Sequence, residues 1–239
     1  MNPFVRAVWS DLLIVTYAVP DAALEPFLTP GLTLDRYAGR AHVSMVAFRF
    51  RQTRVLGVPA PFGDFPQWNL RFYVAPGGDA ETHGGNERGI VFLQEFIPSP
   101  IIATTVRTLY KEPYRAAPLA CRVTTVGPLR RVRYDLRVAN RTHTLAASAW
   151  GPPSVPPLGS AEEFFTGQGW GRGRSRAGRP TGFHVTHPPW RVYAVREYYS
   201  SVDFEGLYGP RWAFLGDQTP CSVILCEGSA VGVSPPGTL

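Results

Sequence analysis

Lysine is nearly absent from this 239-residue sequence. Lys111 is the only one, and every other basic residue is arginine, whose guanidinium stays charged and hydrogen-bonds planar anions in a fork. We attribute most of this bias to codon usage in a GC-rich genome. The formal net charge is +6, and a mild positive balance does not by itself indicate a nucleic-acid partner.

Cysteine is also scarce, and long apolar runs are missing. The three cysteines, Cys121, Cys221 and Cys226, are odd in number and match no zinc motif. The sequence therefore predicts buried thiols in a reducing compartment. The apolar run at residues 12–15 is too short for a signal peptide, and no run approaches the ~20 apolar residues of a membrane helix. We expect a cytoplasmic protein with no membrane association, no bound metal and no cofactor.

Glycine, proline and apolar residues are abundant. The chain has 24 Gly and 24 Pro spread along its length, and it is 44% hydrophobic. Short apolar runs separated by such residues are typical of a mainly β protein with many turns. The Pro-rich stretch 151–159 is the one plausible boundary, but too little chain follows it for a second core. Residues 1–239 are predicted to form a single domain.

Hydrophobic periodicity locates the expected elements. Strands are expected at residues 12–17, 70–74, 90–96, 130–138, 142–150, 190–199 and 221–226. A hairpin is expected at residues 32–50, with its turn at 38–40. Short helices are expected at residues 20–28, 101–110 and 161–165, and Gly-rich loops at 77–89 and 169–178.

Four segments carry a family resemblance. They are residues 12–24, 69–74, 107–114 and the His-Pro-Pro-Trp stretch at 187–190. In order and spacing the chain resembles the YqjF-like family of uncharacterised bacterial proteins, which is placed in the acetoacetate-decarboxylase-like superfamily. The resemblance implies a mainly β fold, with an antiparallel sheet curled into a cone or barrel around a central cavity and a few short peripheral helices.

The decarboxylases of that superfamily use a lysine that forms a Schiff base with a keto acid. Their motif reads Gly-Arg-Glu, four further residues, then Pro-Lys-Lys. Arg107 and Pro113 match this motif, whereas Tyr114 replaces the nucleophilic lysine and Arg115 replaces its cationic neighbour. A phenol cannot form an imine, so the decarboxylase mechanism is not expected in this chain.

The candidate catalytic residues are Arg107, Tyr114 and Glu95. Arg107 and Tyr114 occupy positions of the superfamily motif. Glu95 lies in an otherwise apolar strand, where a buried carboxyl would have a raised pKa and could act as an acid or base. It could equally form a structural ion pair with an arginine.

The candidate ligand-binding residues are Arg71, Tyr73, Lys111, Arg115 and His187. Arg71 and Tyr73 share one face of a strand, and would clamp a carboxylate or phosphate if that face lines the cavity. If it faces water, they are ordinary surface residues; the resemblance favours the cavity. Like charge from nearby arginines could lower the pKa of Lys111, although a solvated lysine beside Glu112 is the simpler interpretation.

His187 begins a predicted rigid turn. Trp190 is expected to contact the core, and His187 to line the cavity or to hydrogen-bond the backbone. His184 lies three residues earlier, so on an extended segment the two rings point to opposite faces. The pair therefore does not indicate a metal site.

Two functional hypotheses follow. The preferred one is a cavity that binds a small organic anion, with conversion of that ligand left open. The alternative is a non-enzymatic module that binds nucleic acid or a protein partner through the basic Gly/Arg loop at residues 171–179. Nucleic acid is the less favoured partner, because only Trp170 offers an aromatic platform beside the loop. A homo-oligomer is compatible with either hypothesis.

Overall fold

Strands dominate the chain, as the spread of glycine and proline predicts. The computed structural model describes residues 3–77, 87–174 and 179–238. Its strands belong to one 15-stranded sheet. They are β1 Val5–Val19, β2 Leu32–Leu34, β3 Ala41–Val55, β4 Val58–Pro59, β5 Phe65–Pro76, β6 Gly89–Ile97, β7 Tyr114–Ala116, β8 Leu119–Val126, β9 Leu129–Val138, β10 Arg141–Ser154, β11 Trp170–Arg174, β12 Pro180–Thr186, β13 Val192–Ser201, β14 Ser222–Val233 and β15 Gly237–Thr238.

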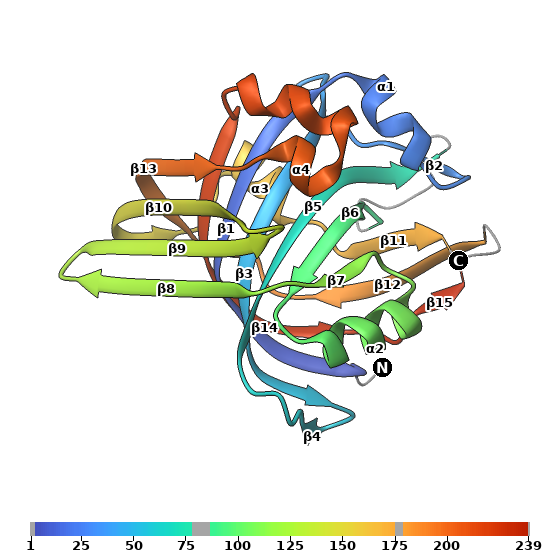
Figure 1. Ribbon diagram of the computed structural model, residues 1–239, viewed down its shortest axis with the longest axis horizontal. Helices are drawn as coiled ribbons and strands as arrows, with labels where there is room; N and C mark the ends of the chain where they lie inside the picture. The colour runs from blue at the N-terminus through green and yellow to red at the C-terminus, as the bar shows by residue number, and fades with distance from the viewer. Residues whose placement is uncertain (1–2, 78–86, 175–178, 239) are drawn as a thin grey trace.

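Seven of these strands close into a ring. The order is β12, β11, β6, β5, β3, β1 and β14, and β14 pairs back onto β12 through Val185 with Val233 and Thr186 with Gly232. Figure 1 shows these strands curling around one another. The expected barrel-like sheet is confirmed. It is antiparallel apart from two parallel pairings, β6 with β7 and β6 with β11.

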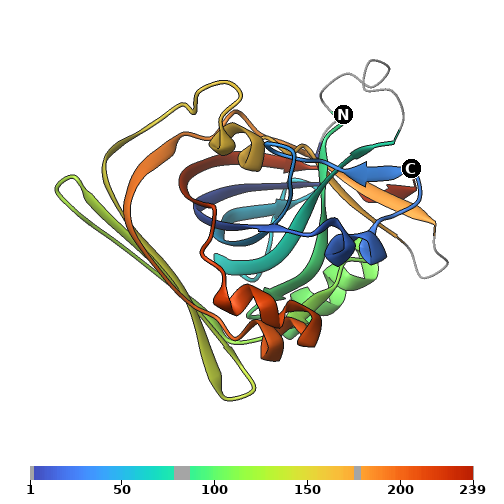
Figure 2. The same cartoon turned by 90° about the horizontal axis from the view of Figure 1, so that it is seen from above.

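The remaining long strands form an arm beside the ring. The first part of β14 pairs with β13 at Cys226 and Leu225, and β10, β9 and β8 follow in order. Both views show this arm standing away from the ring on one side (Figures 1 and 2). The long strand β14 therefore belongs to the ring at one end and to the arm at the other.

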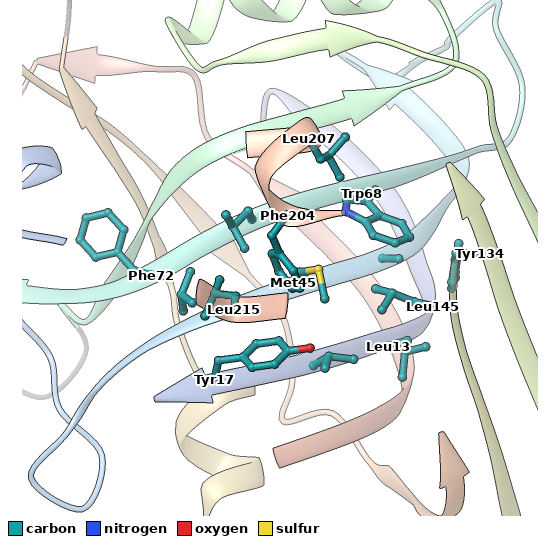
Figure 3. Close-up of a cluster of buried hydrophobic side chains, with 14 of the residues drawn as sticks. Leu13, Tyr17, Met45, Trp68, Phe72, Tyr134, Leu145, Phe204, Leu207 and Leu215 are labelled. Atoms are coloured by element: carbon teal, nitrogen blue, oxygen red, sulfur yellow. The ribbon is translucent and has the colours of Figure 1, made fainter. Parts of the chain in front are cut away.

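The main hydrophobic core lies outside the ring, between its wall and the arm. Along β1, β3 and β5 every second side chain points to this core, because successive residues of a strand face opposite sides. Figure 3 shows the resulting cluster. It includes Leu13, Tyr17, Met45, Trp68, Phe72, Tyr134, Leu145, Phe204, Leu207 and Leu215. The opposite faces of the same strands point into the ring.

Short helices cover the ends of the sheet. They are α1 Asp21–Leu24, η1 Glu25–Phe27, α2 Pro100–Tyr110, α3 Ala161–Thr166, α4 Phe204–Tyr208 and η2 Pro210–Asp217. The α2 helix begins where the Ser99 hydroxyl accepts a hydrogen bond from the Ile102 amide at 3.3 Å. It ends at Lys111, whose left-handed backbone (φ 62°) stops the helix. The helices expected at residues 20–28, 101–110 and 161–165 are confirmed.

Three expectations are wrong. The β2 strand pairs with β5 instead of forming a hairpin with β3, although the turn forms as a bridge between Tyr37 and Arg40. Cys221 is exposed and Cys121 is half-buried, so only Cys226 is a buried thiol. Residues 170–174 form a strand where a loop was expected, while 175–178, like most of the expected 77–89 loop, lie outside the described residues.

The described helices are all short. None is both long and apolar enough to span a bilayer.

Candidate functional site

The interior of the ring is a cavity of about 160 Å³. Every one of the seven ring strands contributes side chains to its wall, and α2 and the segment after α3 close it. The wall is mainly apolar. On the same measure a water molecule needs about 10–15 Å³, so the cavity has room for a small organic molecule.

Polar groups enter the cavity from β5. Gln67, Asn69 and Arg71 point inward, whereas Trp68 and Leu70 point to the core on the other side of the sheet. The alternation expected for this strand is therefore present, and both of its faces are buried.

Arg71 is the one arginine or lysine among the described residues that line the cavity. Its side chain is largely enclosed, with 7% of its surface exposed. Its Nη2 donates to the Phe165 carbonyl at 3.2 Å, while its Nε is buried without a hydrogen-bond partner in the described chain. A buried guanidinium is stable only when paired or well hydrogen-bonded, and here that requirement is only partly met.

Tyr73 shares the inward face of β5 but takes no part in the lining. Its hydroxyl lies 2.6 Å from the Ser44 hydroxyl, and its ring contacts Phe164 and Phe165 with centroids 5.6 and 5.2 Å away. Burial raises its pKa. Tyr73 lies beside Arg71, whose guanidinium carbon is 5.9 Å from its ring centroid, but Phe164 and Phe165 cover the phenol, so only Arg71 of the expected clamp lines the cavity.

Glu95 of β6 is fully buried beside Asn69 and lines the cavity. Its Oε2 accepts a hydrogen bond from Gln67 Nε2 at 2.5 Å, and its Oε1 has no partner in the described chain. Burial, with the neighbouring carboxyl of Glu112, raises its pKa well above the usual range. In the neutral form of Glu95, Oε2 accepts the hydrogen bond from Gln67, so the proton is on Oε1. The Oε1 hydroxyl can then donate a hydrogen bond.

Glu112 is a second acid in the cavity that sequence reasoning missed. It is only 5% exposed, and burial raises its pKa to about 8. It follows Lys111, at which the left-handed backbone turns the chain, so the helical pattern cannot predict its direction. Lys111 is exposed, as the simpler interpretation expected, and it donates to the Thr108 carbonyl, not to Glu112.

Tyr114 lies at the cavity wall with these acids. Its hydroxyl donates to Gln67 Oε1 at 3.4 Å, and Tyr114 also pairs with Glu95 across β7 and β6, so Gln67 hydrogen-bonds both side chains. Burial, with the charges of Glu95 and Glu112, raises the pKa of Tyr114 well above its usual range. The phenol is therefore a hydrogen-bond donor, not a nucleophile, at neutral pH.

Three expected site residues lie outside the cavity. Arg107 is exposed on α2, because Ile102, Val106 and Tyr110 occupy the helix face that turns inward. Lys111 caps the same helix in solvent. Arg115 follows Tyr114 on β7, so alternation sends it to the outer side, where it lies 5.6 Å from the Phe96 ring centroid.

His187 lies at one end of the cavity. Its ring stacks on Trp190 at 4.0 Å, and its Nδ1 is 2.9 Å from the Pro188 carbonyl. Burial lowers its pKa. An adjoining outer pocket shares Thr166, Val185, His187 and Trp190 with the cavity. Residues 187–190 connect β12 to β13 without regular structure, and His187 lines both the cavity and this outer pocket.

Unpartnered polar atoms concentrate in the cavity. Ten buried side-chain nitrogen and oxygen atoms of the described chain have no hydrogen-bond partner, and six belong to residues that line the cavity. These are Trp9 Nε1, Thr53 Oγ1, Asn69 Oδ1, Arg71 Nε, Glu95 Oε1 and Gln168 Oε1. Such atoms are rare in native proteins unless a ligand or water serves them. Their clustering makes the cavity the candidate binding site of the described chain.

In the basic stretch at 171–179, residues 171–174 belong to β11, while 175–178 lie outside the described residues. Arg172 is buried and donates to the Glu87 carbonyl at 3.1 Å. Arg174 donates to the carbonyls of Pro26 and Leu28, each at 3.2 Å. The described part of this stretch therefore serves the fold. Among the described residues, no cluster of three or more His, Cys, Asp or Glu side chains could hold a metal ion.

Comparison with known proteins extends this description. Residues 6–230 match the model of the DUF2071 family, described as an uncharacterised conserved protein. The chain belongs to the DUF2071 family. A DUF2071 relative in sequence is the uncharacterised protein YqjF of Bacillus subtilis, 31% identical over 111 residues, which cover 46% of this chain and 43% of YqjF. The YqjF-like resemblance is thereby confirmed.

Solved structures resemble the DUF2071 chain over almost all of its length. Acetoacetate decarboxylase from Legionella pneumophila has a TM-score of 0.66 at 12% identity, covering 99% of this chain and 87% of that one. An acetoacetate decarboxylase-like enzyme from Sphingomonas wittichii has 0.66 at 12%, covering 100% and 94%. The enduracididine biosynthesis enzyme MppR complexed with pyruvate has 0.65 at 15%, covering 100% and 91%. At these identities the likeness shows the fold.

Proposed function

We propose that this DUF2071 chain binds a small organic monoanion inside the ring, with the negative charge of the ligand on Arg71. The observation that carries the proposal is the state of Arg71: a buried cation with an unpartnered Nε in an otherwise mainly apolar cavity. An anion that pairs with this guanidinium gains a charge-assisted, bidentate hydrogen bond. It also removes the cost of the unpaired buried charge.

Glu95 and Glu112 do not repel an anionic ligand when their carboxyls are neutral. Burial raises the pKa values of both Glu95 and Glu112. Both shifts favour the neutral carboxyls, and neutral carboxyls leave the positive charge of Arg71 uncancelled. A single charge in the site favours a monoanion over a dianion. The free Oε1 of neutral Glu95 can then donate a hydrogen bond, or a proton, to the bound ligand.

The structural relatives agree with this ligand class. MppR is described as complexed with pyruvate, which is a small monocarboxylate. The superfamily resemblance thus supports a carboxylate ligand. Because Tyr114 stands in place of the motif lysine, a reaction of this ligand would not proceed through an imine.

Calorimetric titration with small carboxylates, supported by thermal shift, tests the proposal. Arg71→Gln removes the charge while keeping a polar side chain, and we expect affinity to fall at least tenfold, since a charge-assisted bond contributes about 1.5–3 kcal/mol. Arg107→Gln makes the same chemical change on the exposed face of α2 and should leave affinity within twofold of the wild type. Equal losses in the two variants, or a wild type that binds no carboxylate, would refute binding at Arg71.

A further inference from the structure

The polarity of the cavity changes along β5. Phe65, Gln67, Asn69 and Arg71 follow one another at every second position and all line the wall. At ~3.3 Å per residue, Phe65 and Arg71 are roughly 20 Å apart along the strand. One end of this row is therefore aromatic, the middle is amide and the other end is cationic.

The neighbouring strands continue the aromatic end. Phe50 of β3 pairs with Phe65, and their rings stack at 4.9 Å with an interplanar angle of 12°. Ile97 of β6 lies beside them in the same apolar cluster. In the opposite direction along β6, Glu95 pairs with Asn69. The side chains of β6 therefore change from apolar to polar in the same direction as those of β5.

The α2 helix covers the aromatic end. Ile102 and Val106 are one helical turn apart, so both lie on the face that meets the cavity. Phe62, from the turn between β4 and β5, adds an edge-on contact with Phe65 at 6.0 Å. Every side chain named at this end is a hydrocarbon, and a charged ligand group would lose its hydration there without compensation.

We infer that the ligand is an amphipathic monocarboxylic acid, whose carboxylate pairs with Arg71 and whose hydrocarbon part extends toward Phe50, Phe65, Ile102 and Val106. The inference rests on the proposed function, because it assigns the anionic end of the ligand to Arg71. It adds the chemical class: straight-chain or aromatic acids, in preference to acids as short as acetate or pyruvate. The cavity volume of about 160 Å³ limits the hydrocarbon part to a short chain or a single ring.

The experiment is a calorimetric series on the full chain with unbranched carboxylates from acetate to octanoate. Each methylene that enters the apolar end should tighten binding about fourfold, as expected for roughly 0.8 kcal/mol per buried CH₂. The gain should stop once the end is filled. Hexanamide, which keeps the chain but lacks the charge, should bind at least tenfold more weakly than hexanoate.

Val106→Phe shortens the apolar end and is the diagnostic variant. It should weaken octanoate at least tenfold, leave acetate within twofold, and move the plateau to a shorter chain. Leu109→Phe, on the exposed side of α2, is the matched control and should keep the wild-type series. If Val106→Phe does not fold, the wild-type series still decides.

The outcomes separate the inference from the proposed function. Affinity that depends on Arg71 but stays flat from acetate to octanoate overturns the amphipathic ligand and leaves anion binding intact. Equal binding of hexanoate and hexanamide overturns the role of the carboxylate. No binding of any acid in the series overturns the proposed function itself.

Discussion

At the scale of single residues, Glu112 makes stability depend on pH. Burial raises its pKa to about 8 in the folded chain, against an ordinary value of 4.5. The folded state therefore holds a proton that the unfolded chain releases above pH 4.5. The stabilisation is complete below that pH and is lost as the pH rises to about 8.

Urea unfolding between pH 5 and 8.5 measures this loss. The wild type should lose free energy of unfolding as the pH rises, with Glu112 contributing up to about 1.4 kcal/mol per pH unit. Glu112→Gln should flatten the slope, with Glu95 retaining part of it because its pKa is also raised. Glu205→Gln, on the exposed side of α4, should keep the wild-type slope. A Glu112→Gln slope equal to that of the wild type contradicts the assignment.

Lys111 gives a second prediction at this scale. A Schiff base requires a partly neutral amine placed at the ligand carbonyl, and Lys111 lies in solvent at the end of α2. Incubation with acetoacetate followed by borohydride should therefore leave the mass of the Lys111 peptide unchanged. The N-terminal amine is checked separately. Stoichiometric labelling that disappears in Lys111→Arg would instead place imine chemistry at this lysine.

The residues that sequence analysis placed well are those governed by strand alternation. The period of two on β5 separated Arg71 from Leu70 and predicted that Arg71 and Tyr73 share a face, while the family resemblance favoured the cavity for that face. The same rule, applied to β7, sends Tyr114 inward and Arg115 outward, but the motif match gave both the same weight. Glu112 was not predicted, because its side-chain direction depends on the left-handed turn at Lys111. Hydrophobic periodicity in the sequence does not show where such a turn occurs.

At the scale of elements, the β1–β14 pair depends on one glycine. The β1 strand bulges at Asp11, and Gly228 of β14 pairs with the preceding Ser10. Gly228 has φ +87°, and a Cβ there would lie 2.0 Å from the Trp9 carbonyl oxygen. Only glycine fits this close approach.

Gly228→Ala should therefore lower the free energy of unfolding by about 3 kcal/mol or more, from backbone strain together with the clash. Gly216→Ala is the matched control: its Cβ would meet nothing within 4 Å and its φ is not positive. That variant should stay within about 0.5 kcal/mol of the wild type. Chemical denaturation of the two variants checks the prediction, and similar stabilities would contradict it.

The β11 strand shows where element prediction fails. Glycine is disfavoured in strands, so the Gly-Arg repeat at residues 171–174 indicates a loop. In the structure Gly171 pairs with Phe183, and a Cβ on it would lie 2.2 Å from that ring. Gly171 is needed because the Phe183 ring on the partner strand occupies the space where a side chain would lie. Strand propensity depends on residue type alone and does not account for this contact.

At the scale of the whole molecule, β14 joins the ring to the arm. It pairs with β1, β12 and β13, so neither part of the sheet is complete without it. We therefore expect the chain to unfold as one cooperative unit, in agreement with the single domain predicted from the sequence. Far-UV and near-UV circular dichroism should give coincident urea transitions, whereas two separated transitions would indicate independent units.

Truncation tests the same expectation more severely. Removing residues 222–239 deletes β14 and should abolish cooperative unfolding, because β1 and β13 lose their shared partner. Removing only residues 237–239 deletes β15 at the edge of the sheet, and the transition should remain cooperative. A longer truncation that still folds cooperatively would show that the arm or the ring is stable alone.

The pairing of β1 with β14 also determines when the ring can form during protein synthesis. The ribosome makes β1 long before β14, so a nascent chain carries β1 without one of its two neighbours until residues 222–233 have been added. The apolar residues of β1 and β3 are exposed for that time, and such strands are prone to associate with other chains. The ring, and with it the cavity, can close only after β14 has been made.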